Sequence, residues 1–294
     1  MTSFVRGGFF ETATRQSPTP TRSADGPFER LFSQSLPPRW WRGLSSAAGG
    51  ILVPLGHLGY GDLGSLSTEE RLDHGIVSIL PGIQTGGNLE FNLARGLNEG
   101  GVDMGIEIYE WTTGFPPLLL YHLCALRRNK RVAQELANKI CAYQDQYPGR
   151  PVHLIGYSGG AGVTVLTLEA LPADRKVTSV ILLAAAIAPT YDLGAAVSHT
   201  ERGIWSFHSP WDCLVLGIGT LIFGTIDRRR TIAAGARGFV VDHKTKQPGD
   251  DEVGAKLHQQ PYVAKMLGSW NSGGHLSCTN RVFGTEWLAP LLKE

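Results

Sequence analysis

The sequence has few cysteines, and none of them stands in a pattern that binds a metal. Its 294 residues include four, at Cys124, Cys141, Cys213 and Cys278. They show no C-x-x-C spacing, and no histidine pattern typical of a zinc site accompanies them. We therefore expect no metal and no cofactor. Ordinary buried thiols are the favoured state of these residues, and a disulfide between Cys213 and Cys278 is the alternative.

Long hydrophobic runs are also missing. Residues 1–20 contain no uninterrupted apolar core of signal-peptide length and no clear cleavage site. The most continuous apolar run, residues 213–226, has 14 residues and three glycines, fewer than the roughly 20 residues that span a bilayer. The sequence therefore predicts no integral membrane segment, and the simplest expected location is the cytoplasm.

The chain has no large excess of charge of one sign. With 27 basic and 26 acidic residues, its formal net charge is +1. Two basic clusters stand at residues 127–131 and 228–230, but no aromatic residues are interleaved with them. We interpret them as a solvated helix end and a charged loop in preference to a site for an anionic partner, and we expect no nucleic-acid partner.

Residues 1–48 lack periodic hydrophobicity and are rich in Ser, Thr, Pro and Arg. This composition predicts a largely disordered N-terminal extension, followed by one domain over residues 49–294. Trp40 and Trp41, flanked by arginines, interrupt the extension. They could rest on a membrane surface or a partner, but docking onto the main domain is the favoured interpretation.

Strand-like and helix-like segments alternate from Ile76 onward. Because the strands are apolar on both faces and are separated by helices, the sequence predicts an α/β fold with a mostly parallel sheet covered on both faces. The expected strands are 76–80, 104–111, one starting at 152, 177–186, 203–208 and a last one at 238–241; the expected helices start near an Asn88 cap, span 129–146, follow Ser158 and occupy 282–292.

The most informative segment is 152–165, VHLIGYSGGAGVTV, which sets Ser158 between small residues where a buried strand should turn into a helix. Gly156 and Gly160 complete the pattern G-x-S-x-G, the nucleophile elbow, in which a strained turn excludes bulky neighbouring side chains. Ser158 would then lie at a helix N-terminus, where unpaired N–H groups favour developing negative charge.

Residues that can activate such a serine follow in the order Ser, Asp, His. Asp212 follows the strand-like segment 203–208, and His275 follows two glycines near the C-terminus. His275 would take the Ser158 proton, and Asp212 would fix the tautomer of His275 and stabilise its imidazolium. Two alternatives stay open: Asp192 as the acid and His243, closer to the expected last strand, as the base.

These residues resemble the α/β-hydrolase superfamily of serine hydrolases, and more narrowly a group of uncharacterised lipase-like bacterial proteins. The likeness covers the chain from Ile76 to its end. It rests on LPGI at 80–83, EWTTG at 110–114, YPGRPVHLIGYSGG at 147–160 and GGH at 273–275. The resemblance implies an α/β-hydrolase fold, a Ser158–His275–Asp212 triad and no cofactor.

The resemblance also implies an oxyanion hole. Its first donor is the N–H of the residue after the nucleophile, Gly159. Its second comes from the loop after the superfamily's third strand, here Ile83 in Pro81-Gly82-Ile83-Gln84. Proline replaces the histidine that the superfamily often has in this loop, and proline donates no backbone hydrogen bond. The side chain of Gln84 is an alternative donor.

The expected activity is hydrolysis of a small-molecule carboxylic ester through an acyl-enzyme. Tyr157, Gln84 and Trp211 are candidate substrate-binding residues, and Trp111 is a further aromatic candidate. An acyltransferase, a thioesterase or amidase with the same triad, and a noncatalytic binding protein are the alternatives. The segment between Asp212 and His275 is a candidate lid, although residues 214–226 could equally form a helix packed on the sheet. The sequence gives no oligomeric state.

Overall fold

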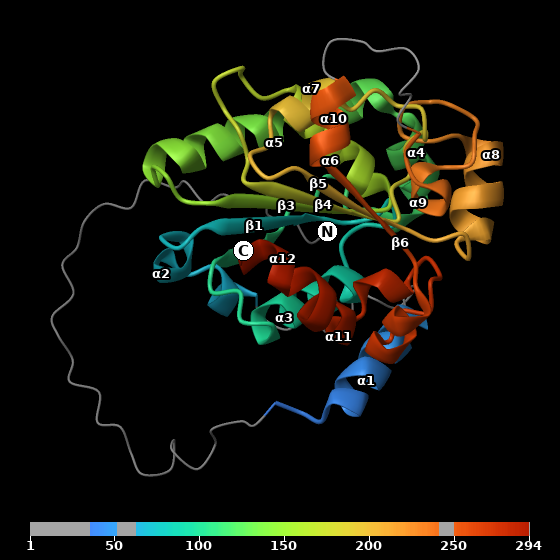
Figure 1. Cartoon of the computed structure of the whole chain (residues 1–294), viewed down its shortest axis with the longest axis horizontal. Coiled ribbons are helices and arrows are strands. Elements are labelled where there is room, and N and C mark those ends of the chain that lie inside the picture. Colours follow the sequence, from blue (N-terminus) through green and yellow to red (C-terminus); the bar gives the residue numbers. More distant parts are fainter. Residues whose placement is uncertain (1–35, 52–62, 241–249, 294) are drawn as a thin grey trace, which may run out of the picture.

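The computed structural model describes residues 36–51, 63–240 and 250–293. Within them, six parallel strands form one sheet in the order β2-β1-β3-β4-β5-β6, and helices lie on both of its faces (Figure 1). This arrangement confirms the predicted α/β fold class. No helix among these residues is both long and apolar enough to cross a membrane.

The strands are β1 (Ile76–Leu80), β2 (Gly105–Ile108), β3 (Val152–Tyr157), β4 (Ser179–Leu183), β5 (Ile204–His208) and β6 (Leu257–Pro261). The longer helices are α1 (Arg39–Ile51), α3 (Asn88–Glu99), α5 (Leu126–Gln146) and α6 (Gly159–Glu169). The shorter helices are α2 (Glu69–Leu72), α4 (Leu119–Cys124), α7 (Gly194–Ser198), α8 (Thr220–Phe223), α9 (Ala234–Arg237), α10 (Asp250–Lys256), α11 (Arg281–Phe283) and α12 (Ala289–Lys293). Helical turns η3 (Gly64–Leu66), η4 (Pro116–Leu118), η6 (Ala264–Ser269) and η7 (Ser277–Thr279) are of the 3-10 type, and η5 (Cys213–Gly219) and η8 (Gly284–Leu288) are π-helical.

The two faces of the sheet support two separate hydrophobic cores. Successive side chains of a strand point to opposite faces, so Leu154 packs with α5 and α6 while its neighbour Ile155 packs with α3 and the C-terminal helices. Every residue of β1, β3 and β4 is buried. In Figure 1, α5, α6, α7 and α10 lie on one side of the sheet, and α3, α11 and α12 lie on the other.

The last strand is not where the sequence predicts it. Residues 238–240 form no strand, and the edge strand is β6, Leu257–Pro261. Its sequence LHQQP hides it, because a half-exposed edge strand carries few apolar residues. The Gln259 side chain hydrogen-bonds both main-chain groups of Phe239. Its Oε1 accepts from the Phe239 N–H at 2.7 Å, and its Nε2 donates to the Phe239 carbonyl at 2.9 Å. The prediction of a final strand at 238–241 was therefore wrong in its described part; residue 241 lies outside the described residues.

Smaller differences concern the ends of the elements. Asn88 is the first residue of α3, and the cap is Gly87, whose N–H donates to the Glu90 carboxylate at 2.9 Å. Strands β2 and β4 are shorter than expected, whereas the C-terminal helical segment is present over 281–293. All four cysteines are free, so the disulfide alternative is wrong.

Part of the expected N-terminal extension is an ordered helix. Helix α1 packs against α3 and α11, where its Gly43 carbonyl accepts from Asn280 Nδ2 at 3.0 Å and its Ser46 Oγ accepts from the Arg281 N–H at 3.1 Å. Arg42 and Arg281 both pair with the buried carboxylate of Glu99. Helix α1 thus orders residues 39–48 of the segment that was expected to be largely disordered, while residues 1–35 lie outside the described residues. The division at residue 48 stays a prediction.

The two tryptophans take little part in this docking. Trp40 and Trp41 are 60% and 50% exposed, and their rings meet edge to face at 5.7 Å. Helix α1 instead docks through its glycines, serine and arginine, and a Cβ on Gly43 would lie only 2.2 Å from the Trp270 ring.

Candidate active site

Ser158 lies in a strained turn between β3 and α6. Its backbone has φ 54° and ψ −117°, a conformation that non-glycine residues rarely adopt. The end of β4 holds this turn from both sides: the Ser158 N–H donates to Leu183 O at 2.9 Å, and the Ala186 N–H donates to Ser158 O at 3.0 Å. The elbow geometry expected from G-x-S-x-G is therefore present, with the serine at the N-cap of a helix.

The structure brings Ser158, His275 and Asp212 together in one chain of hydrogen bonds. His275 Nε2 is 3.0 Å from Ser158 Oγ, and His275 Nδ1 is 2.6 Å from Asp212 Oδ2. The Asp212 side chain is 3% exposed and that of His275 is 12% exposed. With Nδ1 donating to the carboxylate, Nε2 is free to accept the serine proton. This arrangement can activate the serine hydroxyl as a nucleophile.

Buried contacts fix the position of the histidine loop. The Tyr157 hydroxyl donates to His275 O at 3.2 Å, and its ring lies 5.3 Å from the imidazole. Gly273, at φ 82°, takes a conformation that suits glycine, and its N–H donates to Asn271 Oδ1 at 2.9 Å. A Cβ on Gly273 would also lie 2.8 Å from Ser209 Oγ. Gly273 therefore allows the close approach of this loop to the residues that follow β5.

Of the two rival residues, only Asp192 lies within the described part of the chain. Asp192 is exposed and its Oδ1 accepts from the Gly194 N–H at 2.8 Å, so it caps the turn before α7 and makes no contact with His275 that the structure records. His243 lies outside the described residues. His208 lies at the end of β5 beside Gly238, and burial lowers its pKa.

The loop expected to supply the second oxyanion donor lies directly against the elbow. We call residues 81–84, which follow β1, the 81–84 loop. The Ile83 backbone nitrogen is 3.6 Å from the point that a Cβ on Gly159 would occupy. A Cβ on Gly160 would lie 2.3 Å from Pro81 O and 2.4 Å from Leu80 O. The N–H of Gly159, in the first turn of α6, has no acceptor within that helix. The two residues expected to donate, Gly159 and Ile83, are therefore close neighbours at the start of α6.

Two buried side chains hold the 81–84 loop by its carbonyl groups. His122 Nδ1 is 2.8 Å from Ile83 O, and Trp111 Nε1 donates to Pro81 O at 2.6 Å. The Thr113 N–H donates to His122 Nε2 at 3.1 Å, which leaves the ring proton on Nδ1, facing Ile83. Burial lowers the pKa of His122, which keeps the ring neutral. Trp111 and His122 thereby hold the peptide groups immediately before and after the Gly82–Ile83 peptide, which carries the expected donor.

Glu90 holds the same loop by its N–H groups. Its Oε1 accepts from the Gly82 N–H at 3.3 Å and from Gln84 Nε2 at 3.2 Å, and its Oε2 accepts from Gly87. Burial raises the pKa of this fully enclosed carboxyl to about 7, with a smaller contribution from Glu110. The Gln84 amide, expected as an alternative oxyanion donor, is therefore bound to Glu90.

The raised pKa of Glu90 predicts a pH-dependent stability. In the unfolded chain the carboxyl titrates near 4.5 and in the folded chain at about 7, so folding favours the protonated form. Its contribution is full below pH 4.5 and is lost as the pH rises through 7. Between pH 5 and pH 8, the free energy of unfolding should fall by about 2.5 kcal/mol relative to Glu90→Gln. Urea unfolding of both proteins across this range measures the difference; a rise would contradict the prediction.

A cavity of about 670 Å³ opens beside His275. Its walls come from α1 and from the segment 267–280, and they include Ala47, Leu267, Trp270 and Leu276. The cavity is thus largely apolar and borders the base of the Ser–His–Asp cluster. Its α1 wall belongs to the region that composition alone assigns to a disordered extension.

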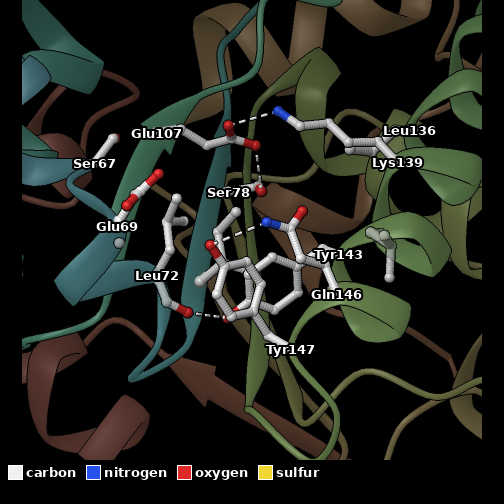
Figure 2. A pocket seen from close by; sticks show the side chains of 13 residues that line it. Ser67, Glu69, Leu72, Ser78, Glu107, Leu136, Lys139, Tyr143, Gln146 and Tyr147 are labelled. Atoms are coloured by element: carbon white, nitrogen blue, oxygen red, sulfur yellow. Dashed lines mark hydrogen bonds and ion pairs between the residues drawn. The ribbon is translucent and has the colours of Figure 1, made fainter. Parts of the chain in front are cut away.

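A second cavity, of about 160 Å³, lies between α5 and the beginnings of β1 and β2 (Figure 2). Inside it, Glu107 accepts from Ser78 Oγ at 2.8 Å and pairs with Lys139 Nζ at 2.5 Å. All strands run in one direction. Ile76 and Gly105, where β1 and β2 begin, therefore lie at the N-terminal ends of the strands, whereas Ser158 lies at the C-terminal ends. This cavity is therefore separate from the Ser–His–Asp cluster.

The expected substrate-binding residues have different surroundings. Tyr157 is fully buried and bonded to the histidine loop, whereas Trp211 is 70% exposed beside Gly273. Sequence reasoning missed Glu90 and His122. The only local signal for Glu90 is its place three residues after the cap of α3, and His122 is a lone histidine in an apolar run, which more often marks a structural residue.

Comparisons with known proteins give a partial match. The family model VirJ, described as "Bacterial virulence protein (VirJ)", matches residues 114–198. This range contains Ser158 but neither Asp212 nor His275. No curated protein matches the chain. Among solved structures, the chain is similar to a lipase-esterase related protein from Clostridium acetobutylicum ATCC 824, at 12% identity and a TM-score of 0.37, over 77% of this chain and 96% of that one.

Proposed function

We propose that the protein is a serine hydrolase that cleaves carboxylic esters through an acyl-enzyme. The observation that carries the proposal is the hydrogen-bond chain from Ser158 Oγ through His275 to Asp212, with bonds of 3.0 and 2.6 Å. His275 is 117 positions from Ser158 and 63 positions from Asp212 in the sequence, so the fold brings distant residues together. A buried carboxylate, an oriented imidazole and a serine in a strained elbow form the constellation that acyl transfer requires.

The residues divide the reaction into two steps. In the first, His275 Nε2 removes the Ser158 proton as Oγ bonds to the ester carbonyl carbon, and the same nitrogen returns that proton to the departing alcohol. In the second, His275 deprotonates a water that attacks the acyl-serine, and the proton goes back to Ser158 as the acid leaves. The N–H groups of Gly159 and Ile83 stabilise the oxyanion in both steps.

The surroundings favour an ester with an apolar acyl or alcohol group. The cavity beside His275 offers Leu267, Trp270 and Leu276 as apolar walls. An apolar pocket that meets a few convergent polar groups is the usual form of a small-molecule site.

Covalent labelling tests the proposal directly. A fluorophosphonate probe should add once to the wild-type chain, as seen by intact mass, and peptide mapping should place the adduct on Ser158. Ser158→Ala should lose the adduct, while Ser272→Ala, which changes a serine of the neighbouring cavity, should keep it. Absence of an adduct on folded wild-type protein would refute the nucleophile assignment. Where labelling succeeds, rates on matched esters, thioesters and amides, with and without added alcohol acceptors, rank the possible reactions.

A further inference from the structure

Two helical segments expose apolar side chains near the C-terminal ends of the strands, where Ser158 lies. One is residues 115–121, through η4 and the start of α4, and the other is residues 214–223, through η5 and α8. We define the apolar rim as their most exposed large side chains, which are between 47% and 74% exposed: Phe115, Tyr121, Leu214, Ile218, Ile222 and Phe223. Exposed apolar surface gathered in this way marks an interaction site.

The two segments are neighbours in space. Cys124 Sγ lies 3.7 Å from Phe223 O, which joins the end of α4 to the end of α8, and Figure 1 shows both helices on the same side of the molecule. The segment 214–223 turns buried residues such as Leu216 and Thr220 toward the protein and leaves the others exposed. The rim is therefore one amphipathic surface and not two separate loops.

The rim lies beside the Ser–His–Asp cluster. Segment 213–219 begins directly after Asp212, whose side chain accepts from the Leu216 N–H. The other segment follows Thr113, which is joined through His122 to Ile83. A surface that covers the rim would thus lie next to the Ser158 site.

Both apolar segments are followed at once by basic clusters. Arg127, Arg128, Lys130 and Arg131 follow α4, and Arg228, Arg229 and Arg230 follow α8. From residue 111 to 131 there is no acidic residue. From 213 to 230 there is only Asp227, which accepts from Thr225 Oγ1 and the Ala188 N–H and whose Oδ2 lies 3.6 Å from Arg229 Nε. For a chain whose total charge is only +1, this is a local concentration of positive charge around the rim.

We propose that the apolar rim and its two basic clusters form a face that docks onto an anionic lipid bilayer. Exposed apolar side chains would enter the headgroup region, and the basic clusters would lie over the acidic headgroups. The combination favours an anionic lipid over a second copy of the chain, because the same positive clusters would repel each other across a symmetric contact. Docking would hold the Ser158 site at the membrane interface.

Vesicle sedimentation tests this docking without turnover. Ser158→Ala protein is mixed with phosphatidylcholine vesicles or with vesicles containing 30% phosphatidylglycerol, and the bound fraction is measured at low and high salt. Binding is expected on the anionic vesicles and should weaken with salt. Arg228→Gln with Arg230→Gln should lower the partition coefficient about 25-fold, at about fivefold for each basic side chain. Ile218→Ser with Ile222→Ser should lower it about tenfold or more.

The matched control is Arg150→Gln with Lys176→Gln. It removes the same charge at the N-terminal ends of the strands, away from the apolar rim, and should leave binding unchanged. Equal weakening by this pair would overturn the docking face, and so would absence of wild-type binding to the anionic vesicles. A dimer in light scattering that Ile218→Ser with Ile222→Ser converts to a monomer would overturn it in favour of self-association. None of these outcomes depends on whether Ser158 is a nucleophile, so the docking and the proposed hydrolase activity fail separately.

Discussion

Asp212→Asn should lower kcat for ester hydrolysis by about 10⁴-fold, the effect of the same change in a well-studied serine protease triad. Asp212 Oδ2 is 2.6 Å from His275 Nδ1, and only an acceptor at that position keeps the proton on Nδ1. An asparagine amide can donate to Nδ1, which would put the ring proton on Nε2, facing Ser158. The histidine would then be unable to accept the serine proton, although the packing around it would be unchanged.

The matched control for this change is Asp192→Asn. Asp192 was the rival acid, and its carboxylate caps the Gly194 N–H at the surface. This variant should keep full activity and lose at most about 1 kcal/mol of stability. If Asp192→Asn abolished hydrolysis and Asp212→Asn did not, the acid would be misassigned. Steady-state kinetics on both variants, with thermal unfolding as a check of folding, distinguishes the two assignments.

Gly160→Ala should reduce kcat by about 10² to 10³-fold, the effect of losing one oxyanion donor. The added Cβ would lie 2.3 Å from Pro81 O and 2.4 Å from Leu80 O, two backbone atoms that no rotamer change can move. The 81–84 loop would have to shift away from the elbow and take the Ile83 N–H with it. Overpacking of this kind also costs about 1–3 kcal/mol of stability.

Gly254→Ala serves as the comparison, because a Cβ at that position meets nothing within 4 Å. It should leave kcat unchanged and, in the interior of α10, should raise stability slightly. Turnover is measured at saturating ester, with circular dichroism to show that the Gly160→Ala protein is folded. Normal turnover by a folded Gly160→Ala protein would contradict the assigned role of the 81–84 loop.

The sequence predicts those parts of the fold whose signal is local. The strands β1, β3 and β4 are buried on both faces and stand out as apolar runs, and the G-x-S-x-G turn is fixed by small residues adjacent to Ser158. The edge strand β6 has no such run, because it pairs with a strand on one side only and is partly exposed to solvent. Its backbone pairing with β5 cannot be predicted from the residues LHQQP. Helix α1 was missed for a similar reason: its docking depends on residues more than 200 positions away.

The same distinction holds for the candidate site. The order Ser158, Asp212, His275 was enough to suggest partners, and the distances between their side chains agree with that suggestion. The residues that orient the 81–84 loop, His122 and Glu90, act through backbone groups. Their partners depend on how β1, α3 and α4 pack, so no residue pattern in the sequence identifies them.

Helix α1 also has a consequence for the order of events during synthesis. Ser46 and Gly43 are synthesised 235 and 237 residues before their respective partners, Arg281 and Asn280. At about 5–20 residues per second, α1 waits on the order of 10 to 50 seconds for the surface on which it packs. The cavity beside His275, with walls from α1 and from residues 267–280, is therefore completed only after residues 267–280 have been synthesised. A nascent chain that already holds β3 and the Ser158 elbow would still be without its histidine and without this cavity, so the newly made protein acquires both in a single late step.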